Sequence, residues 1–156
     1  MKSIDAITDL KVRAGYGVTG NQEFPNYQSQ VLMGTAGKFY YDGEWINTYQ
    51  PVSNPNPDLR WEKKHEVNVG IDFAFLKDRI GGSVDYYYRK STDLLYKYAV
   101  SVPPYLYTEM YTNVGVISNQ GVELTLYAKP LVKGDFKWTT YLTAAHNTNK
   151  LEKFTN

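Results

Sequence analysis

The chain of 156 residues contains no cysteine, no long apolar run and no excess of charge of either sign. The absence of cysteine excludes a disulfide framework, thiol catalysis and zinc–thiolate sites. The formal net charge of +1 argues against a general nucleic-acid binder, which would carry a basic stripe. No apolar stretch approaches the roughly 18 residues of a transmembrane helix. Taken alone, these absences and the 15 tyrosines suggest a soluble β protein.

Alternation of apolar and polar residues is the dominant pattern, and it changes that first interpretation. It runs through five segments, at residues 10–18, 65–75, 80–89, 121–129 and 136–147. In each segment one set of alternate positions carries no Asp, Glu, Lys or Arg, while the other set is mixed and charged. A period of two residues is typical of β-strands with two different faces. The sequence therefore predicts an all-β protein with about five long strands.

Two architectures produce such faces, and the lengths of the connections distinguish them. A soluble β-sandwich turns its apolar faces inward, whereas a transmembrane barrel turns them outward to lipid. The connections at 76–79 and 130–135 are short, while those at 20–63 and 103–119 are long. Short turns at one end and long loops at the other are typical of outer-membrane barrels. We expect a segment of an antiparallel up-and-down transmembrane β-barrel.

Strand length supports this expectation, because 11 residues tilted by about 45° rise roughly 25 Å, the height of the apolar band of such barrels. For both short turns to lie at one end, an even number of membrane crossings must lie between Arg89 and Gln120, and zero is the simplest number. We therefore expect residues 93–102 to continue the third strand beyond the membrane, after a bulge near Ser91–Thr92. The fourth strand then begins near Tyr111. We expect residues 1–156 to form a partial barrel wall that is not an autonomous domain, with external segments at 19–63 and 91–120. The residues expected to face lipid are Val67, Val69, Ile71, Phe73, Val84, Tyr86, Val122, Leu124, Leu126 and Leu142.

No constellation of side chains indicates catalysis, so we expect no enzyme, no cofactor and no metal site. Both histidines, His65 and His146, fall on the uncharged face, at the level expected for a membrane interface. Residues 34–39 are glycine-rich but lack the pattern of a phosphate-binding loop. The charged positions of the opposite face are expected to line an aqueous wall or to contact a plug; they are Glu66, Asp72, Asp85, Arg89, Glu123 and Lys137.

Aromatic residues in the long loops are the best candidates for contact with a substrate or a partner. The first loop carries Tyr40, Tyr41, Trp45 and Tyr49, and Tyr105 and Tyr107 lie in the second, close to Tyr111. Flat rings with polar ends suit sugars, peptides and protein interfaces. Packing of the loops on one another is the alternative. Between them, Ser53–Asp58 has the composition of turns and extended polyproline, which indicates a structural role.

The sequence resembles a known family in five segments that occur in the expected order. They are LKVRAGYGVTGNQ at 10–22, NPDLRWEKKHEVNVGIDF at 56–73, GGSVDYYYRKSTDLL at 81–95, NVGVISNQGVELTL at 113–126 and DFKWTTYLTAAHNTNKL at 135–151. This series resembles the SusC/RagA-like TonB-dependent outer-membrane transporters of Bacteroidetes.

The resemblance implies the later part of a plugged barrel of about 22 strands, so we expect the chain to be a piece of a longer protein. It also implies uptake of an oligosaccharide or a peptide across the outer membrane. The implied partners are outer-membrane lipid, a SusD-like surface lipoprotein, and TonB through a plug outside this segment.

Two other functions remain open at this stage. One is a soluble β-sandwich module that binds carbohydrate through its tyrosines. The other is a passive structural barrel without active transport. The sequence names neither the nutrient nor the lipoprotein.

Overall fold

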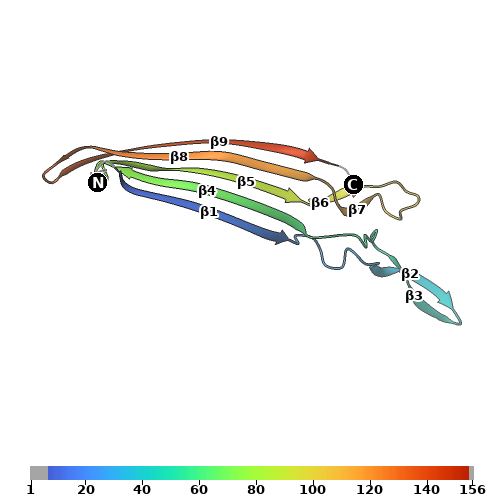
Figure 1. The fold of residues 1–156 in the computed structure, drawn as a ribbon. Coiled ribbons are helices and arrows are strands. Elements are labelled where there is room, and N and C mark those ends of the chain that lie inside the picture. The colour runs from blue at the N-terminus through green and yellow to red at the C-terminus, as the bar shows by residue number, and fades with distance from the viewer. Residues whose placement is uncertain (1–6, 155–156) are drawn as a thin grey trace. The chain divides into compact units, whose positions relative to one another are not determined.

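A computed structural model describes residues 7–154 and consists of strands joined by turns and loops (Figure 1). In chain order the strands are β1 (Ile7–Asn21), β2 (Met33–Tyr41), β3 (Glu44–Pro51), β4 (Glu62–Phe75), β5 (Ile80–Thr92), β6 (Leu95–Ala99), β7 (Glu109–Asn113), β8 (Val116–Lys133) and β9 (Phe136–Lys153). Among these residues no helix is long and apolar enough to cross a membrane.

The chain divides into two compact units. Within the described residues, the first, the sheet unit, consists of residues 7–19, 64–91 and 117–152; the second, the loop unit, consists of residues 20–63, 92–116 and 153–154.

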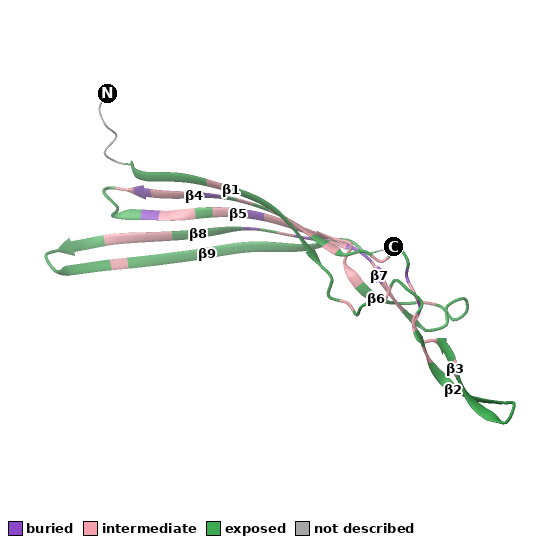
Figure 2. Ribbon diagram, turned by 90° about the horizontal axis from the view of Figure 1, so that it is seen from below, coloured by how far each residue is buried: buried purple, intermediate pink, exposed green. Residues whose placement is uncertain are grey.

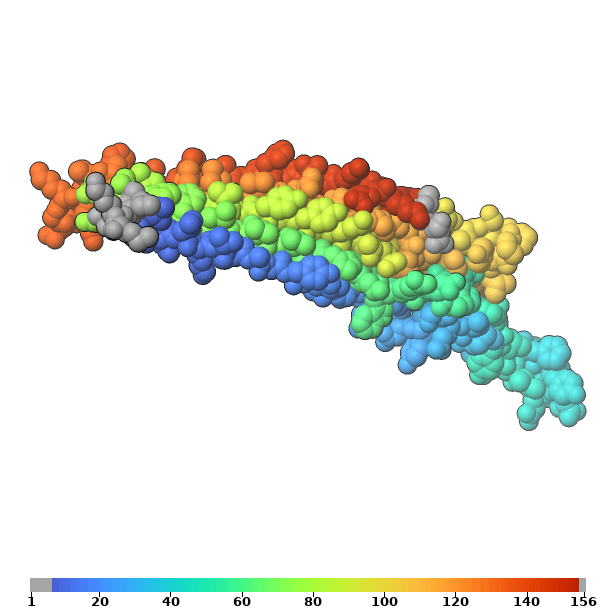
Figure 3. Space-filling view, in the orientation of Figure 1, coloured from blue at the N-terminus to red at the C-terminus, as the bar shows by residue number. Residues whose placement is uncertain are grey.

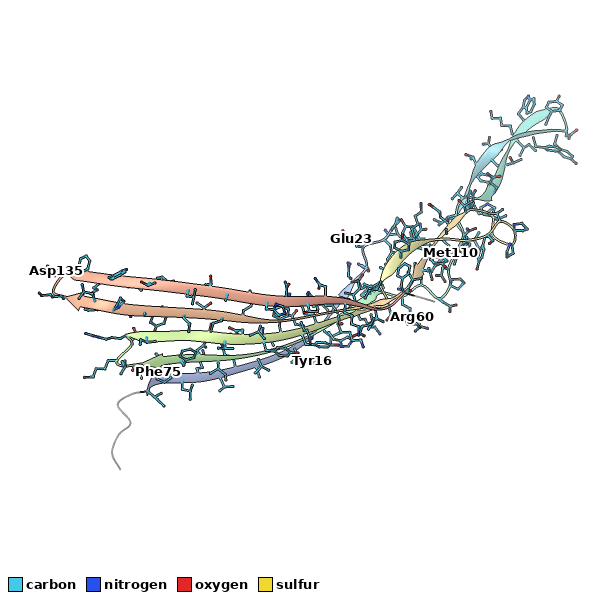
Figure 4. The ribbon with its side chains drawn as sticks, turned by 90° about the horizontal axis from the view of Figure 1, so that it is seen from above. Tyr16, Glu23, Arg60, Phe75, Met110 and Asp135 are labelled. Atoms are coloured by element: carbon cyan, nitrogen blue, oxygen red, sulfur yellow. The ribbon has the colours of Figure 1, made fainter. Side chains whose placement is uncertain are left out.

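The sheet unit is built on one five-stranded sheet with the order β1-β4-β5-β8-β9. Strands β5 and β8 pair antiparallel without a register shift, from Ile80 opposite Ala128 to Ser91 opposite Ile117. The prediction of an all-β chain with five long strands is confirmed. Phe75, at the start of one short turn, and Asp135, in the other, lie at the same end of this sheet (Figure 4). The strands therefore run alternately up and down, as the connection lengths indicate.

The two short turns use left-handed backbone. In the first, φ is 53° at Leu76, 57° at Lys77 and 66° at Asp78, and the amide of Arg79 donates to the carbonyl of Phe75 at 3.1 Å. In the second, φ is 58° at Gly134. This second connection is shorter than the sequence suggests, because residues 130–133 continue strand β8. Pro130 lies beyond the last pair of β8 with β5, in which Ala128 is opposite Ile80.

The third long strand ends earlier than predicted. Strand β5 stops at Thr92, and Asp93 has a φ of 56°. Residues 95–99 then pair with β7, from Leu95 opposite Asn113 to Ala99 opposite Glu109. The predicted extension over 93–102 is thus β6, a strand of a separate two-stranded sheet. Its partner β7 leads into β8 through Gly115, so the fourth long strand begins at Val116 rather than near Tyr111.

The two faces of the five-stranded sheet differ in charge, as alternation along each strand requires. We call the side that carries Arg13, Asp72 and Asp85 the polar face, because these three side chains meet there. On the other side, the uncharged face, charges occur only near the ends of the strands that lie away from the short turns. These end charges are Lys63, Lys90, Lys150 and Glu152, and Lys90 Nζ lies 3.1 Å from Glu152 Oε2.

Little of either unit is buried (Figure 2). Among the described residues the buried apolar side chains are Ala74, Tyr87 and Val114. Phe73 and Leu124, which a sandwich would enclose, are only partly covered. The sheet unit is a single layer, so the described residues do not form the two-layer core of a soluble sandwich.

We predict that the connection between β7 and β8 requires a glycine at position 115. Its φ is 116°, and a Cβ added to it would lie 2.6 Å from the backbone carbonyl oxygen of Lys153. Gly115→Ala is therefore expected to destabilise the loop unit by about 1–3 kcal/mol. Gly17→Ala is the control, because nothing lies within 4 Å of an added Cβ there. Protease susceptibility of the full-length protein would check this; equal resistance of the two variants would contradict the assignment.

Candidate functional site

A charged cluster on the polar face links three neighbouring strands. Arg13 Nε donates to Asp72 Oδ2 at 2.8 Å, and Arg13 Nη2 donates to Asp72 Oδ1 at 2.9 Å and to Asp85 Oδ1 at 2.8 Å. Gly70 makes room for this arrangement, because a Cβ there would lie 2.9 Å from Arg13 Nη2 and would collide with the Asp85 carboxylate. A bidentate guanidinium–carboxylate pair fixes the orientation of both groups. The cluster thus fixes the relative positions of β1, β4 and β5.

A second group on the polar face is centred on Tyr87, which is buried. Its ring covers Gly121, the residue opposite it on β8; a Cβ at Gly121 would lie 2.7 Å from the Tyr87 hydroxyl. The guanidinium carbon of Arg89 lies 4.6 Å from the ring centroid, and Arg89 Nε lies 3.1 Å from Glu66 Oε1. This ion pair lacks the angles of a hydrogen bond, since Arg89 Nε has no hydrogen-bond partner within residues 7–154. Four residues predicted for the polar face therefore contact other side chains of the sheet: Asp72 and Asp85 in the charged cluster, and Glu66 and Arg89 beside Tyr87.

At the short-turn end, Asp78 accepts hydrogen bonds from Tyr127 and from Lys129. The bond from Lys129, followed by that from Tyr127, holds the pKa of Asp78 below its ordinary value. In the loop unit, Lys97 on β6 is paired with Glu109 on β7, and this bond raises the pKa of Lys97. Across residues 7–154 no three His, Asp or Glu side chains gather as metal ligands would.

The aromatic residues of the first loop lie on the β2–β3 hairpin and are divided between its two opposite faces. Tyr40 pairs with Trp45 in the register, and their ring centroids are 5.3 Å apart. Tyr49 shares their face, since it alternates with Trp45 along β3. Tyr41 lies on the opposite face with Phe39, at a centroid distance of 6.4 Å. The hairpin therefore brings together three of the four predicted residues and separates the fourth.

The hairpin side chains are uncovered on both faces. Trp45 is 66% exposed, Tyr40 56% and Tyr41 63%, and the space-filling view shows this hairpin, in cyan, as open surface (Figure 3). A two-stranded hairpin that buries neither face is marginally stable by itself. Exposed aromatic surface of this kind is typical of a binding site for another molecule.

The aromatic residues of the second loop have different environments. Tyr107 donates its hydroxyl to the carbonyl oxygen of Pro51 at 2.7 Å, which ties the second loop to the end of β3. Tyr105, by contrast, lines a cavity of about 510 Å³. Of the two predicted contact residues in this loop, Tyr107 is hydrogen-bonded within the protein, whereas Tyr105 lines a cavity.

Two asparagines of the Ser53–Asp58 segment join the long loops. Asn54 is 5% exposed; its Nδ2 donates to the carbonyls of Tyr107 (2.6 Å) and Glu109 (3.0 Å), and its Oδ1 accepts from the amides of Leu106 and Tyr107. Asn56 Nδ2 donates to the carbonyl of Tyr111 at 2.8 Å. These side-chain amides pair with the backbone before and within β7, as a neighbouring strand would. We call Asn54 and Asn56 the amide clamp.

A third asparagine, Asn113 on β7, also connects the two long loops. Its Oδ1 accepts from the backbone amide of Arg60, and its Nδ2 donates to the carbonyls of Arg60 and Asp93. The cavity of about 510 Å³ lies among these segments, and Asp58, Arg60, Asp93, Tyr105, Met110 and Thr112 line it. Arg60 and Met110 are labelled in Figure 4. Asp58, Arg60 and Asp93 were not predicted as site residues, because a single sequence does not show that two loops meet.

The residues predicted to face lipid occupy the uncharged face. Val84 pairs with Leu124 and Tyr86 with Val122 across β5 and β8, and Ile71 is 42% exposed. At the end of this face away from the short turns, Tyr16 Oη and His65 Nδ1 are 3.1 Å apart. Lipid contact by this face remains a prediction.

Comparison with known proteins connects this geometry to a family. The family model described as "TonB dependent receptor-like, beta-barrel" matches residues 4–155. The chain is 34% identical to the TonB-dependent receptor SusC of Bacteroides thetaiotaomicron over 158 residues, which cover 99% of this chain and 16% of that protein. It is 36% identical to the TonB-dependent receptor P39 of Formosa agariphila, covering 97% of this chain and 14% of that protein.

Among solved structures, the chain is similar to the RagAB peptide importer. The "open-open" state matches with a TM-score of 0.80 at 27% identity, and the "closed-closed" state with 0.76 at 28%. In both cases the match covers 96% of this chain and 16% of the other. The chain therefore spans about a sixth of the length of the proteins it matches.

Proposed function

Because the chain belongs to the TonB-dependent receptor β-barrel family, we propose that it forms part of an outer-membrane importer of oligosaccharides or peptides. The observation that carries the proposal is its similarity to SusC over 99% of its length. The similarity to the RagAB peptide importer supports the same role. The proteins that the chain resembles are receptors and transporters rather than enzymes.

In the proposed mechanism the five strands supply a section of barrel wall, with the uncharged face toward lipid and the polar face toward the lumen. A SusD-like lipoprotein captures the nutrient outside the cell. TonB then remodels a plug that lies outside this chain, and the nutrient passes through. The long connections at 19–63 and 91–120 are external, where they contact the nutrient or the lipoprotein.

Energy dependence separates active import from the alternative of a passive barrel. Cells that produce the full-length protein are expected to accumulate labelled nutrient, and collapse of the proton gradient with an ionophore is expected to abolish that accumulation. Uptake that continues unchanged after collapse would indicate passive diffusion and would overturn the proposal.

The hairpin face formed by Tyr40, Trp45 and Tyr49 is the proposed external contact. Replacing Tyr40 and Trp45 together by serine in the full-length protein is expected to reduce nutrient uptake, or recovery of the lipoprotein on purification, by about tenfold or more, because aromatic anchors dominate binding energy. The matched control is Tyr41→Ser, which removes an equally exposed ring from the opposite face. If the control variant loses as much function as the double variant, the contact is not confined to the proposed face.

A further inference from the structure

The cavity between the two long loops is lined by charged residues that form no ion pair with another residue of the described range. Asp58, Arg60 and Asp93 all line it, and none of them takes part in an ion pair within residues 7–154. Two carboxylates and one guanidinium give the cavity a formal charge of −1. Tyr105 and Met110 line the same cavity, so an aromatic residue and a thioether residue accompany these charges. A ligand that presents a cation next to a short apolar or amide segment would complement this lining.

The frame of the cavity does not use these three side chains. Asp58 donates its backbone amide to Asn56 Oδ1 at 3.1 Å. Arg60 and Asp93 are bound to Asn113 through their backbone atoms. The loops are therefore held together by the asparagine side chains, while the carboxylates and the guanidinium remain available. The asparagines fix the backbone that carries these three residues, and Asp58 and Arg60 are exposed while Asp93 is half-buried, so an incoming ligand can reach them.

We infer that this cavity binds the amino-terminal end of a peptide, with the ammonium group at Asp58 and Asp93 and the first peptide carbonyls near Arg60. The inference rests on the proposed importer function and selects peptide over neutral oligosaccharide as the ligand of this cavity. A neutral sugar carries no formal charge to pair with the two carboxylates or the guanidinium, whereas a peptide end carries one. A peptide end supplies one ammonium and several carbonyl acceptors, and its side chain can contact Tyr105. The volume of about 510 Å³ is within the range of small-molecule sites.

The test uses the purified full-length transporter in detergent micelles and calorimetric titration with two probes. One probe is alanyl-alanyl-alanine amide, with a free amino terminus, and the other is the same peptide acetylated at that terminus. The free amine is expected to bind the wild type at least about tenfold more tightly than the acetylated form, because a charge pair at a polar site is lost on acetylation. Asp58→Asn combined with Asp93→Asn is expected to remove this difference.

Asparagine suits position 93 because it tolerates the left-handed backbone there. The matched control is Asp42→Asn, since Asp42 also has a positive φ, of 51°, and lies exposed in the β2–β3 turn. Equal affinity for the two probes in the wild type would overturn the inference. So would a neutral oligosaccharide whose binding is weakened by Tyr105→Ala but not by the double aspartate variant. Neither result affects the proposed importer, which fails only if the ionophore leaves uptake of peptide and oligosaccharide unchanged.

Discussion

If the uncharged face contacts lipid as proposed, arginine in place of Ile71 is expected to destabilise the assembled barrel by about 2–4 kcal/mol, the cost of a guanidinium at the middle of a lipid-facing band. Ile71 lies between Val69 and Phe73 on the uncharged face of β4, far from the charged end of that face. Val69→Arg should have a similar effect. Urea titration of the full-length protein in lipid vesicles would measure the loss, and the fraction recovered in the outer membrane would report assembly.

Asn68→Arg provides the control on the same strand. Asn68 lies on the polar face in a shallow cavity lined also by Gly15 and Gly17, where added atoms meet nothing within 4 Å. Under the proposed assignment the polar face borders the aqueous lumen, where a cation remains hydrated, so this variant is expected to assemble like the wild type. If Asn68→Arg fails to assemble while Ile71→Arg succeeds, the two faces have been assigned in reverse.

Alanine in place of Asn54 is expected to release the two long loops from each other, at a local cost of about 2–6 kcal/mol. The side chain makes four hydrogen bonds to the backbone of residues 106–109, and each is worth about 0.5–1.5 kcal/mol in a buried setting. Amide hydrogen exchange measured by mass spectrometry should show faster exchange at Leu106 and Tyr107. The five-stranded sheet should keep its protection.

The control for Asn54 is Asn47→Ala, an asparagine on β3 that is exposed and faces Lys38 across the hairpin. It should leave exchange in the second loop unchanged. Unaltered exchange in Asn54→Ala would mean that the clamp contributes little, and the cavity would then lack the frame on which peptide binding depends.

The sheet was predictable from sequence because its signals are local. Alternation along β4 and β5 assigns Val69 and Val84 to one face, and the four residues 76–79 force a reversal between them. The polar cluster was predictable only in part. Alternation places Asp72 and Asp85 on one face, but their bidentate partner Arg13 depends on the register between β1 and β4, which the pattern does not specify.

The loop unit was less predictable because its structure depends on contacts between distant residues. Residues 95–99 alternate like the strand before them, so only the left-handed backbone at Asp93 separates β6 from β5. The Asn-Pro repeats of Ser53–Asp58 have the composition of a turn. The asparagine side-chain amides nevertheless pair with the backbone of residues 52 to 55 positions away in sequence. Composition alone does not predict that pairing.

The β2–β3 hairpin ends in a hydrogen bond between the residues that flank it, so it can be exchanged as one unit. The amide of Val52 donates to the carbonyl of Leu32 at 2.9 Å just outside the two strands, and the amide clamp begins only after that point. Residues 33–51 can therefore be exchanged between homologous proteins as a single graft, provided that the graft keeps the carbonyl oxygen at position 51 that binds Tyr107 and the glycine at position 34 that packs against Val52. Under the proposed function, such chimeras would alter recognition while inheriting the five-stranded sheet and the amide clamp.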